Sequence, residues 1–454
     1  MLIRFVVENV YSFGERKEFN MIPRPRLNTL THHKYKVCGI DLLKMSSVYG
    51  ANAAGKSNLV KAIELLQDIV VDEKLPLNIK KLRFKFQDLS EPKPMLLAIE
   101  FIEEGIPFLY AIEIIGERIS IEELYISGMG KKDDRLLFER KTSSENETTL
   151  KFDAELEKNP EIRPFRDVLV KSFVKPNRPI LKLMSENGEN YFPQVKKAFD
   201  WFSIQLEIVT PFSHPSVFAH RIDTTPDLKK YAEDTLCSLK IGIRKITSQK
   251  QLLSDVYDVD SDLKLKEIIE RIEKDPSYVT GLRNKRGDEI VILKENDKIV
   301  VKQLQLEHEG KSNFAAQFVL GEESDGTIRL LDFVPAFRDI AQKQKVYIID
   351  EIERSIHPLL IKELVSKFSK DDQTNGQLIF TTHESNLLDQ DIFRQDEIWF
   401  AEKDETGSTD LYSLSDFKEH KTIDIRKGYL NGRYGSIPFL ANLKDLNWHD
   451  HAAE

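Results

Sequence analysis

Apolar residues follow two different periodicities along this chain. Short runs of β-branched and aromatic residues, typical of buried strands, occur at residues 2–8, 17–21, 45–49, 95–101, 108–115, 119–126, 289–306, 346–349 and 378–381. Apolar residues recur at helical spacing over 56–71, 326–344 and 357–369. Near both ends of the chain the strand patterns alternate with helix patterns. This alternation predicts a sheet of parallel strands covered by helices.

The order of these patterns predicts an α/β core that is split in the sequence. Three strand patterns follow one another closely over 95–126, which indicates an antiparallel β-subdomain. From about 150 to 280 the pattern is mainly helical and lacks the sustained heptads of a long coiled coil. We therefore expect residues 1–130 and 289–454 to form the two halves of one mixed-sheet core. Residues 131–288 would form a mainly helical insertion.

Composition describes a soluble globular protein and excludes several classes. The chain has 454 residues, enough for two or three lobes, and its formal charge of −9 argues against a protein that coats nucleic acid with its whole surface. This charge does not exclude a local basic groove that binds nucleic acid. Cys38 and Cys237 are the only cysteines, so neither a disulfide framework nor a zinc site is predicted. Without a secretory signal or a membrane-length apolar run, we expect a cytoplasmic protein with no membrane partner.

The strongest chemical signal is Gly-Ala-Asn-Ala-Ala-Gly-Lys-Ser at residues 50–57, between a predicted strand and a predicted helix. In such a loop the glycines let backbone N–H groups approach phosphate oxygens. The lysine meets the β- and γ-phosphates, and the serine hydroxyl ligates Mg²⁺. The predicted nucleotide-binding residues here are Gly50, Asn52, Gly55, Lys56, Ser57 and Asn58. The sequence therefore predicts a P-loop ATPase that uses ATP and Mg²⁺.

A second signal is the acidic pair that ends the strand pattern at 346–349. Asp350 would hold Mg²⁺ at the sheet edge, together with Ser57, and Glu351 would orient or deprotonate the attacking water. A strand that ends in acidic residues is common by itself. Downstream of a phosphate-binding loop, the pair favours a magnesium ligand and a catalytic base.

Two further positions complete the predicted site. His383 follows the strand pattern at 378–381, where an imidazole can hydrogen-bond a γ-phosphate. A predicted helix begins just after Ser324, Asp325 and Gly326. The serine hydroxyl, the first backbone amides and the helix dipole would together face an anion. On spacing alone this second stretch is equally typical of a plain helix cap.

In this order along the chain, Gly50–Ser57, Ser324–Gly326, Asp350–Glu351 and His383 resemble the Walker A, signature, Walker B and switch histidine of ABC-type ATPases. The branch is the one shared with SMC, Rad50 and overcoming-lysogenization-defect (OLD-like) proteins. The sequence is most similar to RloA-like or AAA15/AAA21-type ATPases of prokaryotic restriction and anti-phage defence loci. That closer resemblance is carried by Asn9–Phe13, Gly50–Asn58, Ser324–Thr327, Asp350–Pro358 and Tyr429–Pro438.

Two departures from the ABC pattern matter. The signature reads Ser-Asp-Gly, not the Leu-Ser-Gly-Gly-Gln of transporters, which weakens a transporter interpretation. The resemblance also implies a glutamine that contacts the metal, and Gln87 lies in the expected interval. The stretch Tyr429–Pro438 is either a tight surface turn or a docking element for a partner or neighbouring protomer.

The resemblance implies a function that needs two chains. In this family the signature of one protomer closes over the nucleotide bound to another, so a homodimer or a higher even-numbered homo-oligomer is expected. The implied role is an ATP-dependent sensor or scaffold in an anti-phage system, with slow, regulated hydrolysis. It would control a separately encoded effector, a nuclease or another toxin, and nucleic acid remains open as a ligand.

Three alternatives remain open at this point. One is a DNA-repair or DNA-maintenance ATPase of the SMC/Rad50 type, although the insertion is too short for a long coiled-coil arm. Another is a non-catalytic module in which nucleotide only fixes the shape of a scaffold. The third is a built-in nuclease, for which the 70 or so residues after His383 are too few once the ATPase sheet is complete.

Overall fold

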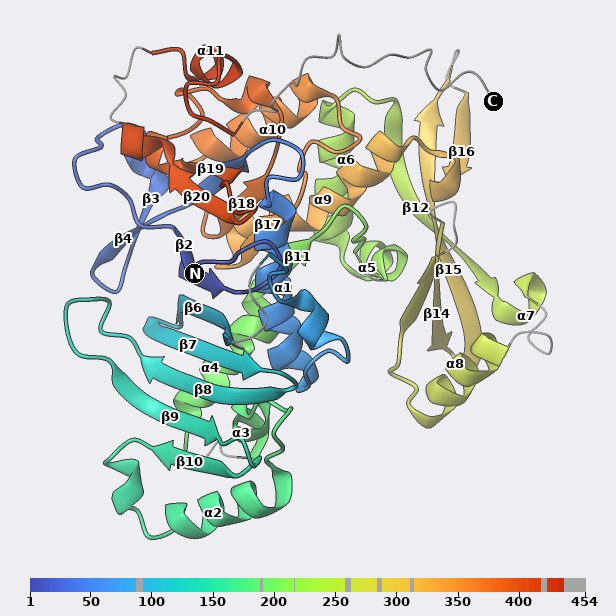
Figure 1. The fold of residues 1–454 in the computed structure, drawn as a ribbon. Coiled ribbons are helices and arrows are strands. Elements are labelled where there is room, and N and C mark those ends of the chain that lie inside the picture. Colours follow the sequence, from blue (N-terminus) through green and yellow to red (C-terminus); the bar gives the residue numbers. More distant parts are fainter. Residues whose placement is uncertain are drawn as a thin grey trace, which may run out of the picture.

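The computed structural model describes residues 1–86, 93–187, 191–215, 217–257, 263–283, 288–310, 314–417 and 423–436. Three large sheets organise these residues (Figure 1). A six-stranded core sheet lies next to a seven-stranded sheet, and a five-stranded sheet stands to one side of both. No helix among the described residues combines the length and hydrophobicity needed to cross a membrane.

The core sheet confirms the predicted parallel arrangement. Its strands run in the order β11 (Leu206–Val209), β17 (Val346–Ile349), β18 (Gln377–Thr381), β5 (Met45–Tyr49), β19 (Ile398–Lys403) and β20 (Thr409–Ser413). All neighbours pair in parallel except β20, which is antiparallel to β19. Two halves of the chain, far apart in sequence, thus share one sheet.

Helices cover both faces of the core sheet because its strands are apolar on both sides. On one face, Val48 and Ile348 share a core with the buried side of α1 (Lys56–Asp72). On the other face, Tyr49 and Ile349 share a second core with α9 (Asp325–Gln342) and α10 (Pro358–Lys370). The three helices predicted from periodicity are therefore confirmed.

The seven-stranded sheet contains both the predicted N-terminal hairpin and the predicted meander. All its pairs are antiparallel. Its strands are β10 (Thr148–Phe152), β9 (Arg135–Thr142), β8 (Arg118–Ile126), β7 (Ile106–Ile115), β6 (Met95–Glu103), β1 (Leu2–Glu8) and β2 (Lys17–Asn20). Helix α1 packs between this sheet and the core sheet, since its buried residues share one apolar core with both.

The five-stranded sheet forms a lateral lobe with the helices around it (Figure 1). Its strands are β12 (Ile243–Leu252), β13 (Thr280–Arg283), β14 (Glu289–Glu295), β15 (Lys298–Glu309) and β16 (Ala315–Val319). The helices that accompany it are α5 (Phe218–Thr224), α6 (Pro226–Ser238), α7 (Leu253–Val256) and α8 (Leu263–Lys274). A short helical turn at Leu320–Glu322 then leads from β16 to α9.

The middle of the chain contains strands as well as the helices expected of it. Residues 131–288 do contain helices, among them α2 (Ile162–Val168), α3 (Leu181–Asn187) and α4 (Pro193–Asp200), but also strands β9 to β13. Strands β9 and β10 extend the seven-stranded sheet past residue 130, and β11 is an edge strand of the core. These strands are short or alternate apolar with charged residues, so their pattern was weak. The segment boundaries themselves stay a prediction.

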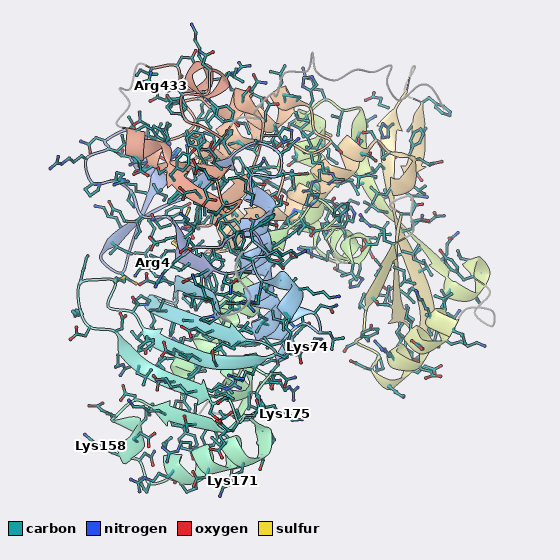
Figure 2. The ribbon with its side chains drawn as sticks, viewed as in Figure 1. Arg4, Lys74, Lys158, Lys171, Lys175 and Arg433 are labelled. Atoms are coloured by element: carbon teal, nitrogen blue, oxygen red, sulfur yellow. The ribbon has the colours of Figure 1, made fainter. Side chains whose placement is uncertain are left out.

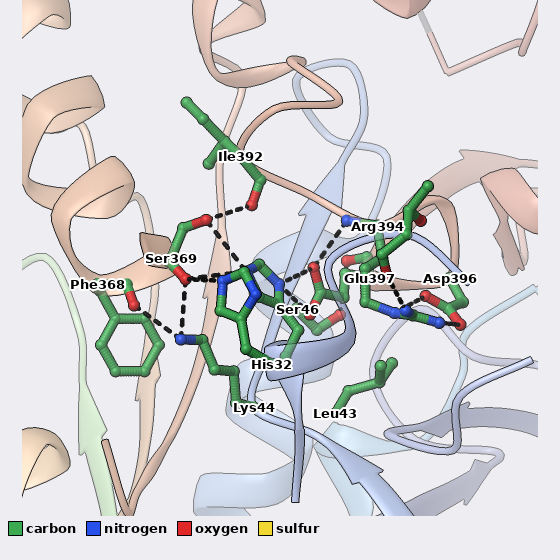
Figure 3. Close-up of polar contacts among 12 residues, drawn as sticks. His32, Leu43, Lys44, Ser46, Phe368, Ser369, Ile392, Arg394, Asp396 and Glu397 are labelled. Carbon is green, nitrogen blue, oxygen red and sulfur yellow. Dashed lines mark hydrogen bonds and ion pairs between the residues drawn. The ribbon is translucent and has the colours of Figure 1, made fainter. Parts of the chain in front are cut away.

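A fully buried polar cluster ties the N-terminal part of the core to its C-terminal part (Figure 3). Lys44 Nζ, just before β5, donates to three carbonyl oxygens at the end of α10, those of Phe368, Ser369 and Asp371. Such a cation is favoured at a helix C-terminus. His33 Nδ1 lies 2.9 Å from both carboxylate oxygens of Glu397, which precedes β19. Burial lowers the pKa of Lys44 to about 8 and that of His33 to about 3.

The C-terminal stretch packs against the chain's own core, so it is not the tight surface turn that the sequence left open. Helix α11 (Ile425–Leu430) and the turn after it bury Tyr429 and Tyr434, and both rings stack on Phe400 of β19, with ring centroids 5.8 and 5.7 Å away. The described part of this stretch is therefore a docking element for the chain's own core, not a surface turn. Ile437 and Pro438 lie outside the described residues.

Candidate nucleotide-binding site

The predicted site residues meet because three parallel strands end at one edge of the core sheet. Strand β18 lies between β5 and β17 and ends at Thr381. The loop after Tyr49 therefore lies on one side of this strand end, and the carboxylate after Ile349 lies on the other. Ligands of open α/β sheets bind outside the carboxyl ends of the strands. This edge therefore carries the candidate site.

The loop at 50–57 wraps around its own lysine. Lys56 is the first residue of α1, and its Nζ donates to the carbonyl oxygens of Gly50 and Ala51 at 2.8 and 3.0 Å. Ala53 and Gly55 have positive φ angles of 65° and 110°, which give the loop its sharp turn. The predicted Asn52 is exposed and Asn58 is half-buried at the start of α1.

Two glycines of this loop are required by close neighbours. A Cβ on Gly50 would lie 2.5 Å from the carbonyl oxygen of Ala401, and a Cβ on Gly55 would lie 2.1 Å from Oγ1 of Thr409. Thr409 Oγ1 also lies 3.0 Å from the carbonyl oxygen of Ala54 and 2.8 Å from Oγ of Ser12. Strand β20 and the N-terminal loop thus support the phosphate-binding loop from behind.

A chain of hydrogen bonds joins the ends of the three strands. The Ser57 hydroxyl donates to Oδ1 of Asp350 at 3.1 Å, and the Thr381 hydroxyl donates to the same oxygen at 2.5 Å. The backbone N–H of Glu351 donates to Oγ1 of Thr381 at 2.8 Å. Thr381 therefore links both acidic residues, and nothing in the sequence motifs pointed to it.

Glu351 projects from a strained backbone position beside the site. Its φ is 51°, in the left-handed region, and its side chain is 37% exposed. Arg354 Nη1 lies 3.7 Å from the carboxylate of Glu351. The guanidinium of Arg354 also lies over the ring of Phe212, with Cζ 4.8 Å from the ring centroid. A non-glycine residue held at positive φ is one sign of a functional position.

His383 turns toward a carboxylate that sequence reasoning did not single out. Glu353, in the same loop as Glu351, accepts from the backbone N–H of His383 at 2.9 Å, and its Oε1 lies 2.7 Å from Nδ1 of the ring. The Glu353 side chain is 7% exposed, whereas that of His383 is 59% exposed. A buried acidic side chain three positions after Asp350 could be recognised only from the folded chain.

The electrostatics of the edge are set by burial and by this group of carboxylates. Burial lowers the pKa of Lys56. Three carboxylates oppose that shift, with Glu353 the strongest, followed by Asp350 and Glu351. A buried ammonium of this kind, hydrogen-bonded to two backbone carbonyl oxygens, would stabilise anionic phosphate oxygens.

The signature stretch lies at the start of α9 and does not reach Lys56. Ser324 caps the helix by accepting from the backbone N–H of Thr327 at 3.1 Å, so the plain-cap interpretation describes its own contacts. Ser324 and Asp325 are exposed. A Cβ on Gly326 would lie 2.7 Å from the carbonyl oxygen of Ser355, so only glycine lets α9 approach the loop that follows Asp350.

The remaining predicted ligand, Gln87, lies outside the described residues. Sequence reasoning also missed Arg329, a buried side chain of α9. Its Nη1 donates to the carbonyl oxygen of Thr210 and its Nη2 lies 3.5 Å from that of Asp350. This arginine joins the signature helix to the end of β17, and no local motif announces it.

Comparison with protein families decides the affiliation. The family model described as "AAA domain, putative AbiEii toxin, Type IV TA system" matches residues 45–389, about three quarters of the chain. The chain belongs to this family. The match runs from the strand before the P-loop to just beyond His383, so it spans every element that builds the site. Membership identifies the chain as an AAA-type ATPase of the AAA21 family. No curated protein matched the sequence.

Three solved structures show a distant likeness to this chain. The head of an SMC protein bound to the C-winged helix domain of ScpA matches with a TM-score of 0.41 and 14% identity, over 92% of this chain and 99% of that one. The SMC head domain from Thermotoga maritima gives 0.36 and 11%, over 91% and 98%. An Smc head domain bound to the C-terminal domain of ScpA, derived from Pyrococcus furiosus, gives 0.41 and 14%, over 95% and 99%.

Proposed function

We propose that this member of the AAA21 family binds ATP with Mg²⁺ at the edge of the core sheet and hydrolyses it slowly. The observation that supports this most directly is the 3.1 Å contact between the Ser57 hydroxyl, in the first turn of α1, and Asp350, the residue after β17. These are the two protein oxygens that a P-loop ATPase presents to its metal.

The donor set suits Mg²⁺. This ion keeps several waters and is bound through one or two carboxylates plus substrate phosphates. Ser57 and Asp350 would hold it, and ATP would supply the remaining oxygen ligands. No group of three or more His, Cys, Asp or Glu side chains suited to a metal occurs in the described part of the chain. When bound, the ion would neutralise charge on the phosphates.

The other residues of the edge take distinct roles in this proposal. Lys56 and the amides of 50–57 bind the phosphates, and Lys56 exchanges its two carbonyl partners for phosphate oxygens. Glu351 orients or deprotonates the attacking water. His383 contacts the γ-phosphate.

We further propose that two copies of the chain share each nucleotide. Ser324 and Asp325 are exposed and capped within their own helix, with helix amides available to an anion. They would meet the ATP bound to a second copy, which gives a homodimer or a higher even-numbered assembly. Arg329 would pass this contact on to the end of β17.

In the cell, the assembly would act as an ATP-dependent sensor or scaffold of an anti-phage defence system and control a separately encoded nuclease or other toxin. The toxin–antitoxin context in the family description supports this role. The alternative, a DNA-maintenance ATPase, requires a basic surface for duplex DNA. Figure 2 labels six basic residues: Arg4, Lys74, Lys158, Lys171 and Lys175 lie in or beside the seven-stranded sheet and its helices, and Arg433 lies in the turn after α11.

The test combines turnover with assembly. Wild-type protein should release phosphate from Mg²⁺·ATP, Lys56→Ala should lose nucleotide binding, and Glu351→Gln should accumulate as an ATP-bound dimer or larger even-numbered species by light scattering. A Glu351→Gln variant that hydrolyses ATP at the wild-type rate would remove the base assignment. A monomer with ATP would remove the shared site. Turnover stimulated by duplex DNA would favour the DNA-maintenance alternative.

A further inference from the structure

Glu353 has a position in the site that the proposed mechanism does not use. It lies in the turn between β17 and α10, and this turn is fixed to the end of β18 by the backbone N–H of Ile352, which donates to the carbonyl oxygen of Thr381 at 3.2 Å. The buried Ile352 anchors the turn in the core. As a result, Glu353 is held beneath the residues that follow Thr381.

A single carboxylate oxygen of Glu353 fixes His383 twice. Oε1 accepts from the backbone N–H of His383 at 2.9 Å and lies 2.7 Å from Nδ1 of its ring. An ionised carboxylate can only accept hydrogen bonds, so Nδ1 must carry a proton. The ring can then rotate little, and Nε2 is the only ring nitrogen left to meet another group.

The second oxygen of Glu353 also requires an explanation. Oε2 is buried and has no hydrogen-bond partner among the described residues. A buried, unsatisfied carboxylate oxygen is costly, and such an atom in a native fold points to a role beyond packing. Glu353 is moreover the carboxylate that acts most strongly on Lys56, so its charge faces the phosphate-binding loop as well as His383.

The geometry points to Glu353 as the positioning residue of His383: its carboxylate holds the ring with Nδ1 protonated and directs Nε2 to the γ-phosphate of the bound nucleotide. This inference rests on the proposed ATPase function. It adds a buried member to the site, one that acts on the nucleotide only through His383. A histidine whose ring nitrogen is fixed by a carboxylate is a recurrent way to set tautomer and orientation.

The first test compares turnover in Glu353→Gln, His383→Ala and the double variant. We expect Glu353→Gln to lower kcat about ten- to a hundredfold, the range seen when the residue that orients a functional histidine is lost. KM should change little, because Lys56 and its loop are intact. The double variant should be no slower than His383→Ala, since Glu353 acts through that ring. The control is Glu384→Gln, the same substitution at the residue that follows His383, and it should keep wild-type turnover.

The second test reads the ring directly. With ¹⁵N-labelled histidine, the His383 signals, identified by their loss in His383→Ala, should show a protonated Nδ1 in the wild type and change in Glu353→Gln. Adding Mg²⁺ with a non-hydrolysable ATP analogue should shift Nε2 in the wild type only. Thermal unfolding of both single variants shows that they are folded.

The outcomes separate this inference from the proposed function. If the wild type hydrolyses ATP and His383→Ala is slow while Glu353→Gln is not, the inference fails and the ATPase assignment stands. An additive double variant or an unchanged ring spectrum in Glu353→Gln also overturns it. If the wild type does not hydrolyse ATP, the proposed function fails, and the ring spectrum with the analogue still decides whether Glu353 orients His383.

Discussion

The support of the phosphate-binding loop by β20 can be tested with one substitution, Gly55→Ala. A Cβ at this position would lie 2.1 Å from Oγ1 and 2.7 Å from Cγ2 of Thr409, so Thr409 must move. The alanine at this position must also adopt a φ of 110°. Moving Thr409 breaks its contacts with Ala54 and Ser12.

The expected magnitude follows from these three effects. An alanine in a left-handed conformation costs roughly 1–2 kcal/mol. The lost hydrogen bonds cost about 1 kcal/mol, and the overpacking roughly 1–3 kcal/mol. We therefore expect Gly55→Ala to lower the free energy of unfolding by roughly 3–6 kcal/mol and to weaken ATP binding, because the loop amides no longer converge on the phosphates.

Urea unfolding and calorimetric ATP titration measure the two effects. Gly105→Ala is the matched control, since Gly105 has a φ of 76° and no atom within 4 Å of the added Cβ, so it carries the backbone strain without the clash. In Gly55→Ala/Thr409→Ala the two closest atoms, Oγ1 and Cγ2, are removed and only the Cβ of residue 409 stays close, at 2.9 Å. The double variant should therefore be more stable than the sum of the single effects by roughly 1–3 kcal/mol. Additive effects, or a Gly55→Ala variant no less stable than Gly105→Ala, would refute the reasoning.

Three further predictions concern Thr381 in the site and two buried residues elsewhere in the core, Lys44 and Tyr434. Thr381→Val should slow turnover about tenfold or more and lower the free energy of unfolding by roughly 1–3 kcal/mol, because Asp350 and the Glu351 backbone lose their shared buried partner; an unchanged kcat would contradict this. Lys44, with its pKa lowered to about 8, loses its proton in the folded chain while the unfolded chain keeps it until about pH 10.5. The free energy of unfolding of the wild type should therefore rise by about 2 kcal/mol from pH 7.5 to 9.5, relative to that of Lys44→Met. If the wild type and Lys44→Met show the same pH dependence, this prediction is wrong. Tyr434→Ala should destabilise the core by roughly 3–5 kcal/mol, whereas Leu430→Ala, at an exposed position of α11, should stay within about 0.5 kcal/mol in the same denaturation assay.

The local sequence was sufficient to predict those parts of the site whose functional residues are close together in the chain. The P-loop, the strand before it and the helix after it follow from residues 45–71 alone, because glycine spacing and apolar period act within one turn of chain. The acidic end of β17 and the start of α9 were predicted for the same reason. Strands β9 to β13 were not, because they are either short or have an apolar pattern that charged residues interrupt.

Only the tertiary structure decided which distant residues complete the site. Thr381 reaches Asp350 because β18 lies between β5 and β17, and Thr409 supports Gly55 across more than 350 residues of chain. Glu353 is an ordinary acidic residue in the sequence, and burial beneath His383 gives it its role. By itself, the sequence determined that this protein presents a phosphate-binding loop and an acidic strand end. Sheet order and burial decided what holds them, since those contacts are made between segments that no local pattern connects.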